Sequence, residues 1–171
     1  MSYKASNSQI LRVWQMLEGK PFGKWLVSRV LCFFVPYFNS IKPVFTLIQP
    51  GQVEAKVEKR RAILNHIKSV HAIAMCNAAE LVAGTCMDVS LSSDFRWIPV
   101  GMEVRYVKIA KTDLHAVCKL DSYSWDEPQD VVMPVSVYDL NGDEVLEAKI
   151  TMRISHKRET ASGDPAAQVL S

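Results

Sequence analysis

The stretch from Val70 to Cys86, VHAIAMCNAAELVAGTC, constrains the fold more than any other part of the chain. Its notably polar residues are His71, Asn77, Glu80 and Thr85. A helix that is apolar nearly all round lies in a protein core, and a carboxylate buried there is costly unless it is paired, hydrogen-bonded or used. We therefore expect a core helix that Ser69 caps and that ends near Gly84, with a functional role for Glu80.

The bulk composition narrows the class of protein. A chain of 171 residues with 49% hydrophobic residues fits one domain with a substantial core. The net charge of +2 is nearly balanced and no basic stripe with interleaved aromatic residues occurs, so nucleic acid is not expected as a partner. The four cysteines lack CxxC spacing and the four histidines lack a metal-ligand pattern. We expect reduced thiols, no metal site and a cytoplasmic location, and the first residues do not resemble a signal peptide.

Two short helices are predicted at the N-terminal end, over residues 8–20 and 22–35, with Gly19, Pro21 and Gly23 between them. The second contains the most apolar part of the chain, residues 25–38. That segment is shorter than the about 20 apolar residues that span a bilayer. We expect it to pack as a helix, and contact with a membrane surface or a partner is the alternative.

The remaining elements are predicted as strands. Residues 53–57 alternate as a half-buried strand, and a basic loop at 59–68 follows it. After the core helix, four further strands are expected at 99–109, 113–120, 131–139 and 145–155. Asn141-Gly142 indicates a hairpin between the last two, and Pro134 indicates that its strand is an edge strand or a bulged one.

The order of these elements predicts an α+β fold in which a curved antiparallel β-sheet wraps a long central helix. We divide the chain into an N-terminal helical extension (1–43), the main domain (44–156) and a flexible tail (157–171). Because the central helix is apolar on most sides, it also needs cover on the side away from the sheet. A second copy of the chain would supply it, so we expect a homodimer.

Three spaced residues resemble a known family. The hotdog-fold acyl thioesterases of the phenylacetate-degradation type carry N-x-x-G-x-x-H-G-G and an acid nine residues after the histidine. Here Asn65 lies six residues before His71, and Glu80 lies nine residues after it. The stretches PYFNSIKP, NHIKSVHAIAMCNAAE and RWIPVGMEVRY also resemble an uncharacterised bacterial branch of hotdog proteins, over roughly residues 20–155. The resemblance implies a hotdog fold with the N-terminal helices added to it.

The resemblance also implies a thioesterase site. Glu80 would be the nucleophile or the general base, and the Ala72 N–H, beside His71 at the helix start, would bind the thioester oxygen. That amide stays free if Ser69 caps the His71 amide. The remaining candidates are Asn65 and Asn77, which would orient water or the carboxylate, and Arg60, Arg61 and Lys68, which would meet coenzyme A phosphates. No separate cofactor is implied, because coenzyme A is part of the substrate.

The chain departs from the family at its glycines. Ala72 and Ile73 replace the two glycines after the histidine, and Lys68 stands at or near the earlier one. Ala72 still supplies a backbone N–H, whereas Ile73 would narrow or reshape the pocket for the acyl group and pantetheine. A non-catalytic acyl or lipid binder is therefore the alternative function. A third interpretation is a protein that docks a partner through its N-terminal helices.

The spacing of His71 and Glu80 predicts where a site can form. Nine residues of helix turn through about 900° and rise about 13.5 Å, so the two side chains point to opposite sides. Two antiparallel helices about a two-fold axis would bring Glu80 of one copy to the His71–Ala72 end of the other. We therefore expect two shared sites per dimer. The sequence leaves open the acyl group, its carrier (coenzyme A or acyl carrier protein), and whether dimers pair into tetramers.

Overall fold

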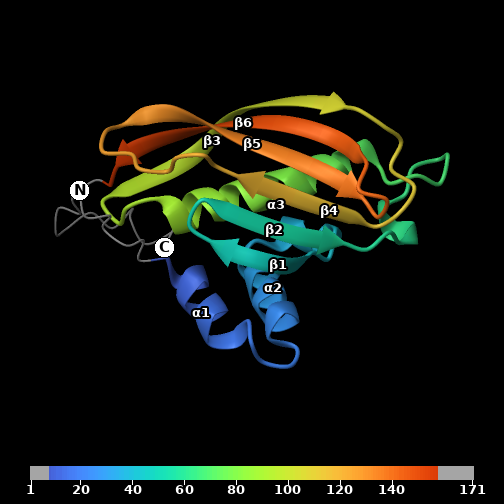
Figure 1. The fold of residues 1–171 in the computed structure, drawn as a ribbon, viewed down its shortest axis with the longest axis horizontal. Helices are drawn as coiled ribbons and strands as arrows, with labels where there is room; N and C mark the ends of the chain where they lie inside the picture. The colour runs from blue at the N-terminus through green and yellow to red at the C-terminus, as the bar shows by residue number, and fades with distance from the viewer. Residues whose placement is uncertain (1–7, 158–171) are drawn as a thin grey trace.

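The structure is a computed structural model that describes residues 8–157. Its helices are α1 (Gln9–Leu17), α2 (Gly23–Phe34), the 3-10 helices η1 (Pro36–Ser40) and η2 (Arg61–Ile63), and the long α3 (Ala72–Ser90). Its strands are β1 (Val44–Gln49), β2 (Gln52–Val57), β3 (Phe95–Tyr106), β4 (Leu114–Lys119), β5 (Gln129–Asp139) and β6 (Glu144–His156). Figure 1 shows the strands curving around α3, with α1 and α2 beyond β1.

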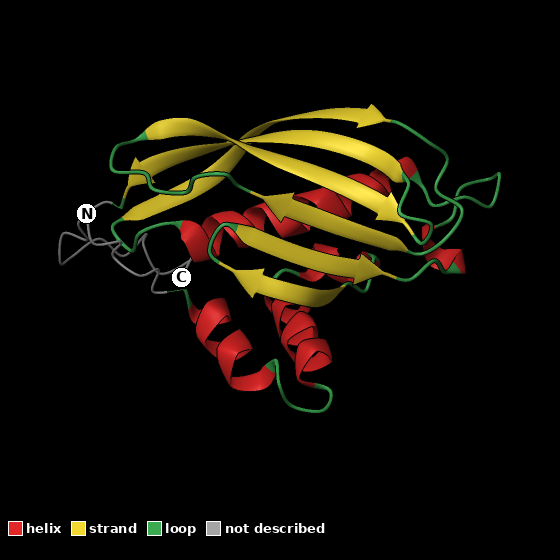
Figure 2. Cartoon of the chain, in the orientation of Figure 1, coloured by secondary structure: helices red, strands yellow, loops and turns green. Residues whose placement is uncertain are grey.

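All six strands form one antiparallel sheet in the order β1-β2-β4-β5-β6-β3. Every second side chain of β6, from Leu146 to Ile154, is buried, as is the set Leu114, Ala116 and Cys118 on β4. These faces pack against α3 on the concave side of the sheet, which Figure 2 shows as one helix crossing beneath the strands. The α+β class, the central helix and the wrapped sheet are thus confirmed.

α3 begins and ends differently from the prediction. Its N-cap is His71, not Ser69, and the helix continues through Gly84 to Ser90. Gly84 is not a helix end but a site of close packing: a Cβ there would lie 3.0 Å from the Trp97 ring. By length and composition α3 could also span a membrane, but 72% of its most apolar window is buried inside the fold, which is typical of a core helix.

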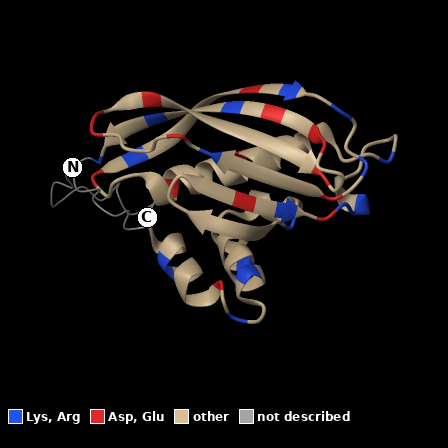
Figure 3. Cartoon of the chain, in the orientation of Figure 1, with Lys and Arg blue, Asp and Glu red and all other residues tan. Residues whose placement is uncertain are grey.

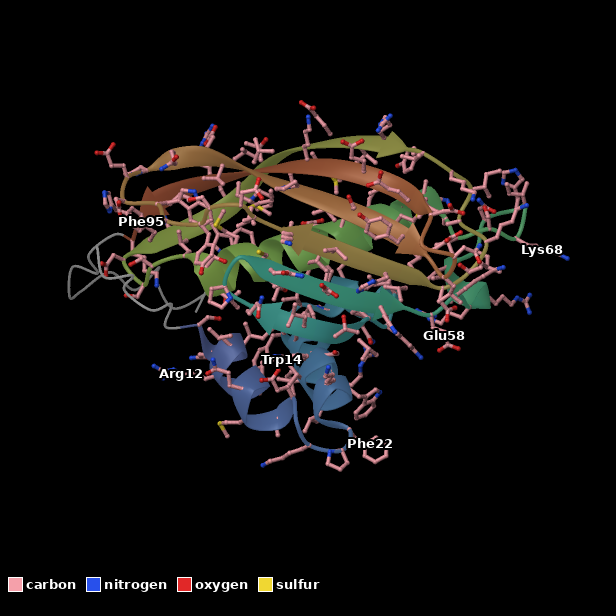
Figure 4. All side chains as sticks on the ribbon, in the orientation of Figure 1. Arg12, Trp14, Phe22, Glu58, Lys68 and Phe95 are labelled. Atoms are coloured by element: carbon pink, nitrogen blue, oxygen red, sulfur yellow. The ribbon has the colours of Figure 1, made fainter. Side chains whose placement is uncertain are left out.

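The two predicted N-terminal helices are present as α1 and α2, which pack as a hairpin. Gly23 permits the tight turn, since a Cβ there would lie 1.8 Å from the Leu17 carbonyl oxygen. Trp14 is buried between this hairpin and the sheet, whereas Phe22 projects from the tip of the hairpin (Figure 4). One side of α2 is buried, and the other exposes Trp25, Phe33 and further apolar residues to solvent.

β1 is a strand that the sequence-based prediction lacks. The segment VFTLIQ pairs with β2, but a register shift between Phe45 and Leu47 interrupts the pairing. Phe45 and Ile48, three residues apart, are therefore its buried residues. The bulge hides the period-two alternation by which a strand is recognised.

The prediction for Pro134 is only partly right. β5 lies inside the sheet between β4 and β6, and its register shift falls at Val137 and Tyr138 rather than at the proline. However, β4 pairs only as far as Val135, so residues 129–134 have β6 as their single strand partner. A proline lacks the N–H for a second partner and is tolerated where pairing is one-sided.

The predicted division into residues 1–43, 44–156 and 157–171 stays a prediction. In the structure the helices precede β1, and the Lys157 N–H donates to the Asp94 carbonyl oxygen. The rest of the predicted tail, residues 158–171, lies outside the described residues.

Candidate active site

The start of α3 presents one free backbone donor. The Ile73 N–H donates to His71 Nδ1 at 3.1 Å, and the His71 N–H donates to the Ile63 carbonyl oxygen at 2.8 Å. The Ala74 N–H donates to the His71 carbonyl oxygen. Within residues 8–157, the Ala72 N–H has no acceptor. The Ala72 amide is therefore free. The acceptors for the neighbouring His71 and Ile73 N–H groups are Ile63 and His71, and not Ser69.

Asn65 and Ser69 shape the loop that leads into this helix start. Asn65 Oδ1 accepts from the Ser69 N–H and the Ile67 N–H, while its Nδ2 donates to Ser69 Oγ at 2.7 Å. Lys68 between them has φ of 61°, a left-handed conformation that glycine adopts without strain. The backbone at Lys68 therefore has a conformation that glycine would adopt more easily. Asn65 and Ser69 are engaged with the loop, which explains why Ser69 does not cap α3.

Glu80 is exposed in the single chain, so the expectation of a buried carboxylate is wrong. It lies on the side of α3 that also carries Ile73, Asn77 and Gly84. This side faces β3 at Gly84 and η1 at Asn77, rather than the middle of the sheet. Its carboxylate forms no ion pair or hydrogen bond with a described residue. The acid therefore lies on a less buried face of the helix, where it is open to a ligand or to another chain.

Asn77 and Arg60 converge on Ser40 at the end of η1. Asn77 Nδ2 donates to Ser40 Oγ at 2.9 Å, and Arg60 Nη2 donates to the Ser40 carbonyl oxygen. Both side chains retain a buried atom without a partner among the described residues, Asn77 Oδ1 and Arg60 Nε. Asn77 therefore joins η1 to α3 one turn before Glu80, and Arg60 joins η1 to the start of η2.

The other predicted contact residues are at the surface. Arg61, Lys68 and Ile73 are exposed, and Lys59 Nζ donates to the Lys111 carbonyl oxygen. Figure 3 shows basic residues around η2 and the loop that follows it, and Figure 4 shows Lys68 projecting from that loop. Among residues 8–157, no three His, Cys, Asp or Glu side chains lie close enough together to hold a metal ion.

β3 brings two further side chains to α3 that the sequence did not single out. Trp97 lies against Gly84, and Tyr106 Oη is 3.2 Å from Cys76 Sγ. That contact with Cys76 raises the pKa of Tyr106. The pairing of β3 shifts register between Pro99 and Gly101. Before the shift the odd-numbered residues of β3 face the helix, and after it the even-numbered residues do. Because the alternation changes at this point, no single period-two pattern selects both Trp97 and Tyr106.

The structure does not bring all predicted catalytic residues together. His71 and Ala72 lie at the beginning of α3, whereas Glu80 lies nine residues further along the same rigid helix. No contact between His71 and Glu80 exists within the described chain. One chain therefore offers two half-sites, a free N–H donor at one place and a free carboxylate at another.

Comparison with known proteins places these features in a family. A family model described as Domain of unknown function (DUF4442) matches residues 23–154. A crystal structure from structural genomics is 41% identical, with a TM-score of 0.77, and the match covers 86% of this chain and 99% of that chain. No curated protein matches the chain.

More distant structures share the fold. A Pseudomonas aeruginosa protein of unknown function, called a probable thioesterase, is 20% identical with a TM-score of 0.70, over 77% of this chain and 95% of that chain. A Haemophilus influenzae thioesterase is 9% identical with a TM-score of 0.64, over 73% and 86%. The chain therefore belongs to the family described as Domain of unknown function (DUF4442), and its fold is the hotdog fold.

Proposed function

We propose that the protein hydrolyses an acyl thioester of coenzyme A or acyl carrier protein, at a site shared by two copies of the chain. One observation carries the proposal. The Ala72 N–H at the start of α3 and the Glu80 carboxylate both lack partners among the described residues. A free donor at a helix start can stabilise an oxyanion, and a free carboxylate can activate water or attack a carbonyl.

The position of the two groups on α3 calls for the second copy. The Ala72 amide and Glu80 are eight residues apart, about 12 Å along the helix and about 80° around it, so one chain cannot bring them together. With two α3 helices antiparallel about a two-fold axis, Glu80 of one copy would approach Ala72 of the other. The midpoint between His71 and Glu80 falls between Met75 and Cys76, so the axis would pass there.

The β3 edge supports this arrangement. β3 is the outermost strand and pairs only with β6, so its other side is open within residues 8–157. It exposes Ile98, Val100, Met102 and Tyr106, which are all large apolar side chains. A long apolar edge strand is a template for pairing with another chain. Antiparallel pairing of two β3 strands would set the two α3 helices side by side on one face of a continuous sheet.

The chemistry at each shared site has two forms. With Glu80 as general base, its carboxylate takes a proton from water while the water oxygen attacks the thioester carbon. The negative charge on the thioester oxygen is held by the Ala72 N–H. The C–S bond then breaks and the proton passes to the leaving thiolate. With Glu80 as nucleophile, its oxygen displaces the thiolate and forms an anhydride, which water then hydrolyses.

The surroundings supply binding groups for the rest of the substrate. Arg61 and Lys68 are exposed near the helix start and suit the phosphates of coenzyme A. Arg60 and Asn77 are held by Ser40, so they would position η1 and α3 rather than bind the carrier directly. The same class of reaction is supported by the Pseudomonas structure, a probable thioesterase, and the Haemophilus structure, a thioesterase.

A non-catalytic acyl binder is the second candidate function. It is favoured by Ile73, which is 54% exposed where the thioesterase motif has glycine, and by the apolar cavity beside Glu80. Such a binder would retain an acyl ligand and release no thiol from it.

The test is free-thiol release from short, medium, long-chain and aryl acyl-CoAs. We expect Glu80→Gln to lower turnover by about 100- to 10,000-fold, as loss of a general base does. Ala72→Pro should lower it by about 100- to 1,000-fold, because it deletes the N–H. Proline is favoured at the first helical position, and His71 already has the extended backbone (φ −64°, ψ 137°) that precedes proline.

Glu127→Gln, in an exposed loop, is the matched control and should be as active as the native protein. Full activity in Glu80→Gln would refute the proposal. A folded native protein that binds acyl-CoA and turns none over would favour the binder.

A further inference from the structure

A cavity of about 490 Å³ opens beside Glu80, between the N-terminal helices on one side and α3 with β3 on the other. This volume falls within the range of small-molecule sites. The cavity touches the same carboxylate that the proposed reaction uses. It is therefore a candidate for the part of the substrate that does not react.

The floor of the cavity runs along α3. Glu80, Gly84 and Asp88 are spaced by four residues and lie on one side of the helix, over about 12 Å from first to last. Gly84 leaves the middle of the floor without a side chain, and the Trp97 ring packs there. With a floor of about 12 Å, the cavity is longer than a single aromatic ring requires.

The walls are apolar side chains of α1, α2 and η1. Ile10 and Val13 come from α1, Val27 and Leu31 from α2, and Phe38 from η1. Apart from Gln9 and Thr85, the polar side chains at the cavity are the two acids of the floor. A ligand inside it gains from burying hydrocarbon and finds few groups for hydrogen bonds.

The two acids at the cavity ends differ. Asp88 accepts a hydrogen bond from Ser8 Oγ just before α1, so that end is fastened to the N-terminal helix. The carboxylate of Glu80 has no such partner among the described residues. The reactive group of a ligand therefore belongs at the Glu80 end, with its tail extending toward Asp88.

We propose that this cavity binds the acyl chain of the substrate and that the chain is a straight aliphatic one of about ten carbons. With C–C bonds of about 1.5 Å in a zigzag, such a chain covers the floor from Glu80 to Asp88. This inference rests on the proposed thioesterase function. If it holds, the substrate site includes the α1–α2 hairpin as well as the start of α3, and the hairpin sets the length of the acyl chain.

The proposal is tested with two ligand series of increasing chain length, from butyl to dodecyl. The first is acyl-CoA, which reports turnover, and the second is the non-hydrolysable alkyl thioether of coenzyme A, which reports binding by calorimetry. For the native protein, each added CH₂ should tighten thioether binding by about fourfold until the cavity is full.

Val13→Trp fills the cavity from α1 and should weaken decyl thioether binding at least tenfold while leaving the butyl compound unchanged. Ile10→Phe is a second filling variant, for use if Val13→Trp does not fold. Met16→Trp, on the exposed side of α1 and away from the cavity, is the control and should behave like the native protein. Equal decyl binding by the native and filled proteins would overturn the proposal.

The two proposals fail in different ways. Chain-length-dependent binding that the filled variants abolish, without thiol release from any acyl-CoA, would uphold the acyl cavity and refute the thioesterase. Turnover that Glu80→Gln abolishes, with no dependence on chain length or on filling, would uphold the thioesterase and refute the cavity.

Discussion

The two edges of the sheet end in opposite ways. At the β1 edge, side chains of α2 bind the backbone: Ser28 Oγ accepts from the Phe45 N–H at 2.9 Å, and Lys24 Nζ donates to the Thr46 carbonyl oxygen. Arg29 adds a bond to the carbonyl oxygen of Pro43. At the β3 edge, within residues 8–157, no side chain or strand binds the outer backbone groups.

This difference indicates which surface is complete within one chain. The β1 edge is short, bulged and covered, which is how proteins protect an edge from pairing. The β3 edge is twice as long and apolar, and Glu80 lies on the side of α3 that faces it. The open edge and the unpartnered carboxylate thus lie on the same side, which is what a site completed by a second copy requires.

The largest expected effect comes from a charge on the open edge. Met102→Asp places a carboxylate at the proposed interface, where pairing of the two copies would take it out of water. We expect monomers by sedimentation and a loss of turnover of about 100-fold or more, since both shared sites would be broken. Gln49→Asp, on the covered β1 edge, is the control and should remain an active dimer. A fully active Met102→Asp monomer would contradict the comparison.

Cross-linking can sharpen the position of the two-fold axis. Cys76 is half-exposed on α3 next to the expected axis, whereas Cys32, Cys86 and Cys118 are buried. A short bifunctional maleimide should therefore join Cys76 of one copy to Cys76 of the other, as seen on a denaturing gel. Cys76→Ser should remove the product. Failure to cross-link a dimeric native protein would exclude an axis at this position.

Removing one bond at the covered edge should affect stability and not assembly. Ser28→Ala leaves the buried Phe45 N–H without its acceptor, which should lower the free energy of unfolding by about 1–3 kcal/mol. Urea unfolding measures this change, with Ser122→Ala in an exposed loop as the control. A Ser28→Ala protein that is fully stable but no longer dimeric would reverse the roles assigned to the two edges.

A smaller change is expected away from both edges. Lys68 has a positive φ, so Lys68→Gly should relieve backbone strain in the folded state. The greater flexibility of glycine in the unfolded chain offsets part of this gain. We expect the free energy of unfolding to rise by about 0.5–1 kcal/mol in total. Thermal unfolding against Lys108→Gly, where φ is not positive, checks the sign. A destabilised Lys68→Gly protein would show that the lysine side chain itself is needed.

The smallest effect concerns an exposed pair between the start of β5 and the end of β6, Asp130 and Arg153. The hydrogen bond and charge of Arg153 hold the pKa of Asp130 below its usual value. Because the folded-state pKa is depressed, the pair stabilises above the pKa of the unfolded carboxyl, about 3.9, and this contribution is lost as the pH falls through the folded value. Urea unfolding of native protein and Asp130→Asn should therefore differ slightly at pH 6 and converge in acid.

The sequence predicted what local patterns determine. α3 follows from a long apolar run, and β6 follows from strict alternation, because burial imposes these periods. β1 was missed because its bulge breaks the alternation. The prediction for Pro134 was only partly right, because β5 is bulged but lies inside the sheet, with a second partner that ends before the proline. Those features depend on how far a neighbouring strand extends, which a single sequence does not contain.

The candidate site divides in the same way. Spacing along one helix predicted that the Ala72 amide and Glu80 belong to different half-sites, since helix geometry fixes their separation. The cavity and the Tyr106–Cys76 contact could not be predicted, because they depend on how the α1–α2 hairpin and β3 pack against α3. The expected burial of Glu80 was wrong for the same reason: Glu80 lies beyond the β3 edge of the sheet, beside the cavity that the N-terminal helices leave.

Mixing two inactive variants tests the shared site most directly. Homodimers of Glu80→Gln and of Ala72→Pro should each be inactive. In a mixed dimer, one site would carry both changes and the other would pair an intact Glu80 with an intact Ala72. Random mixing yields about half mixed dimers, so thiol release should recover to about a quarter of the native rate. No recovery, with mixed dimers verified by native mass spectrometry, would contradict a site shared between chains.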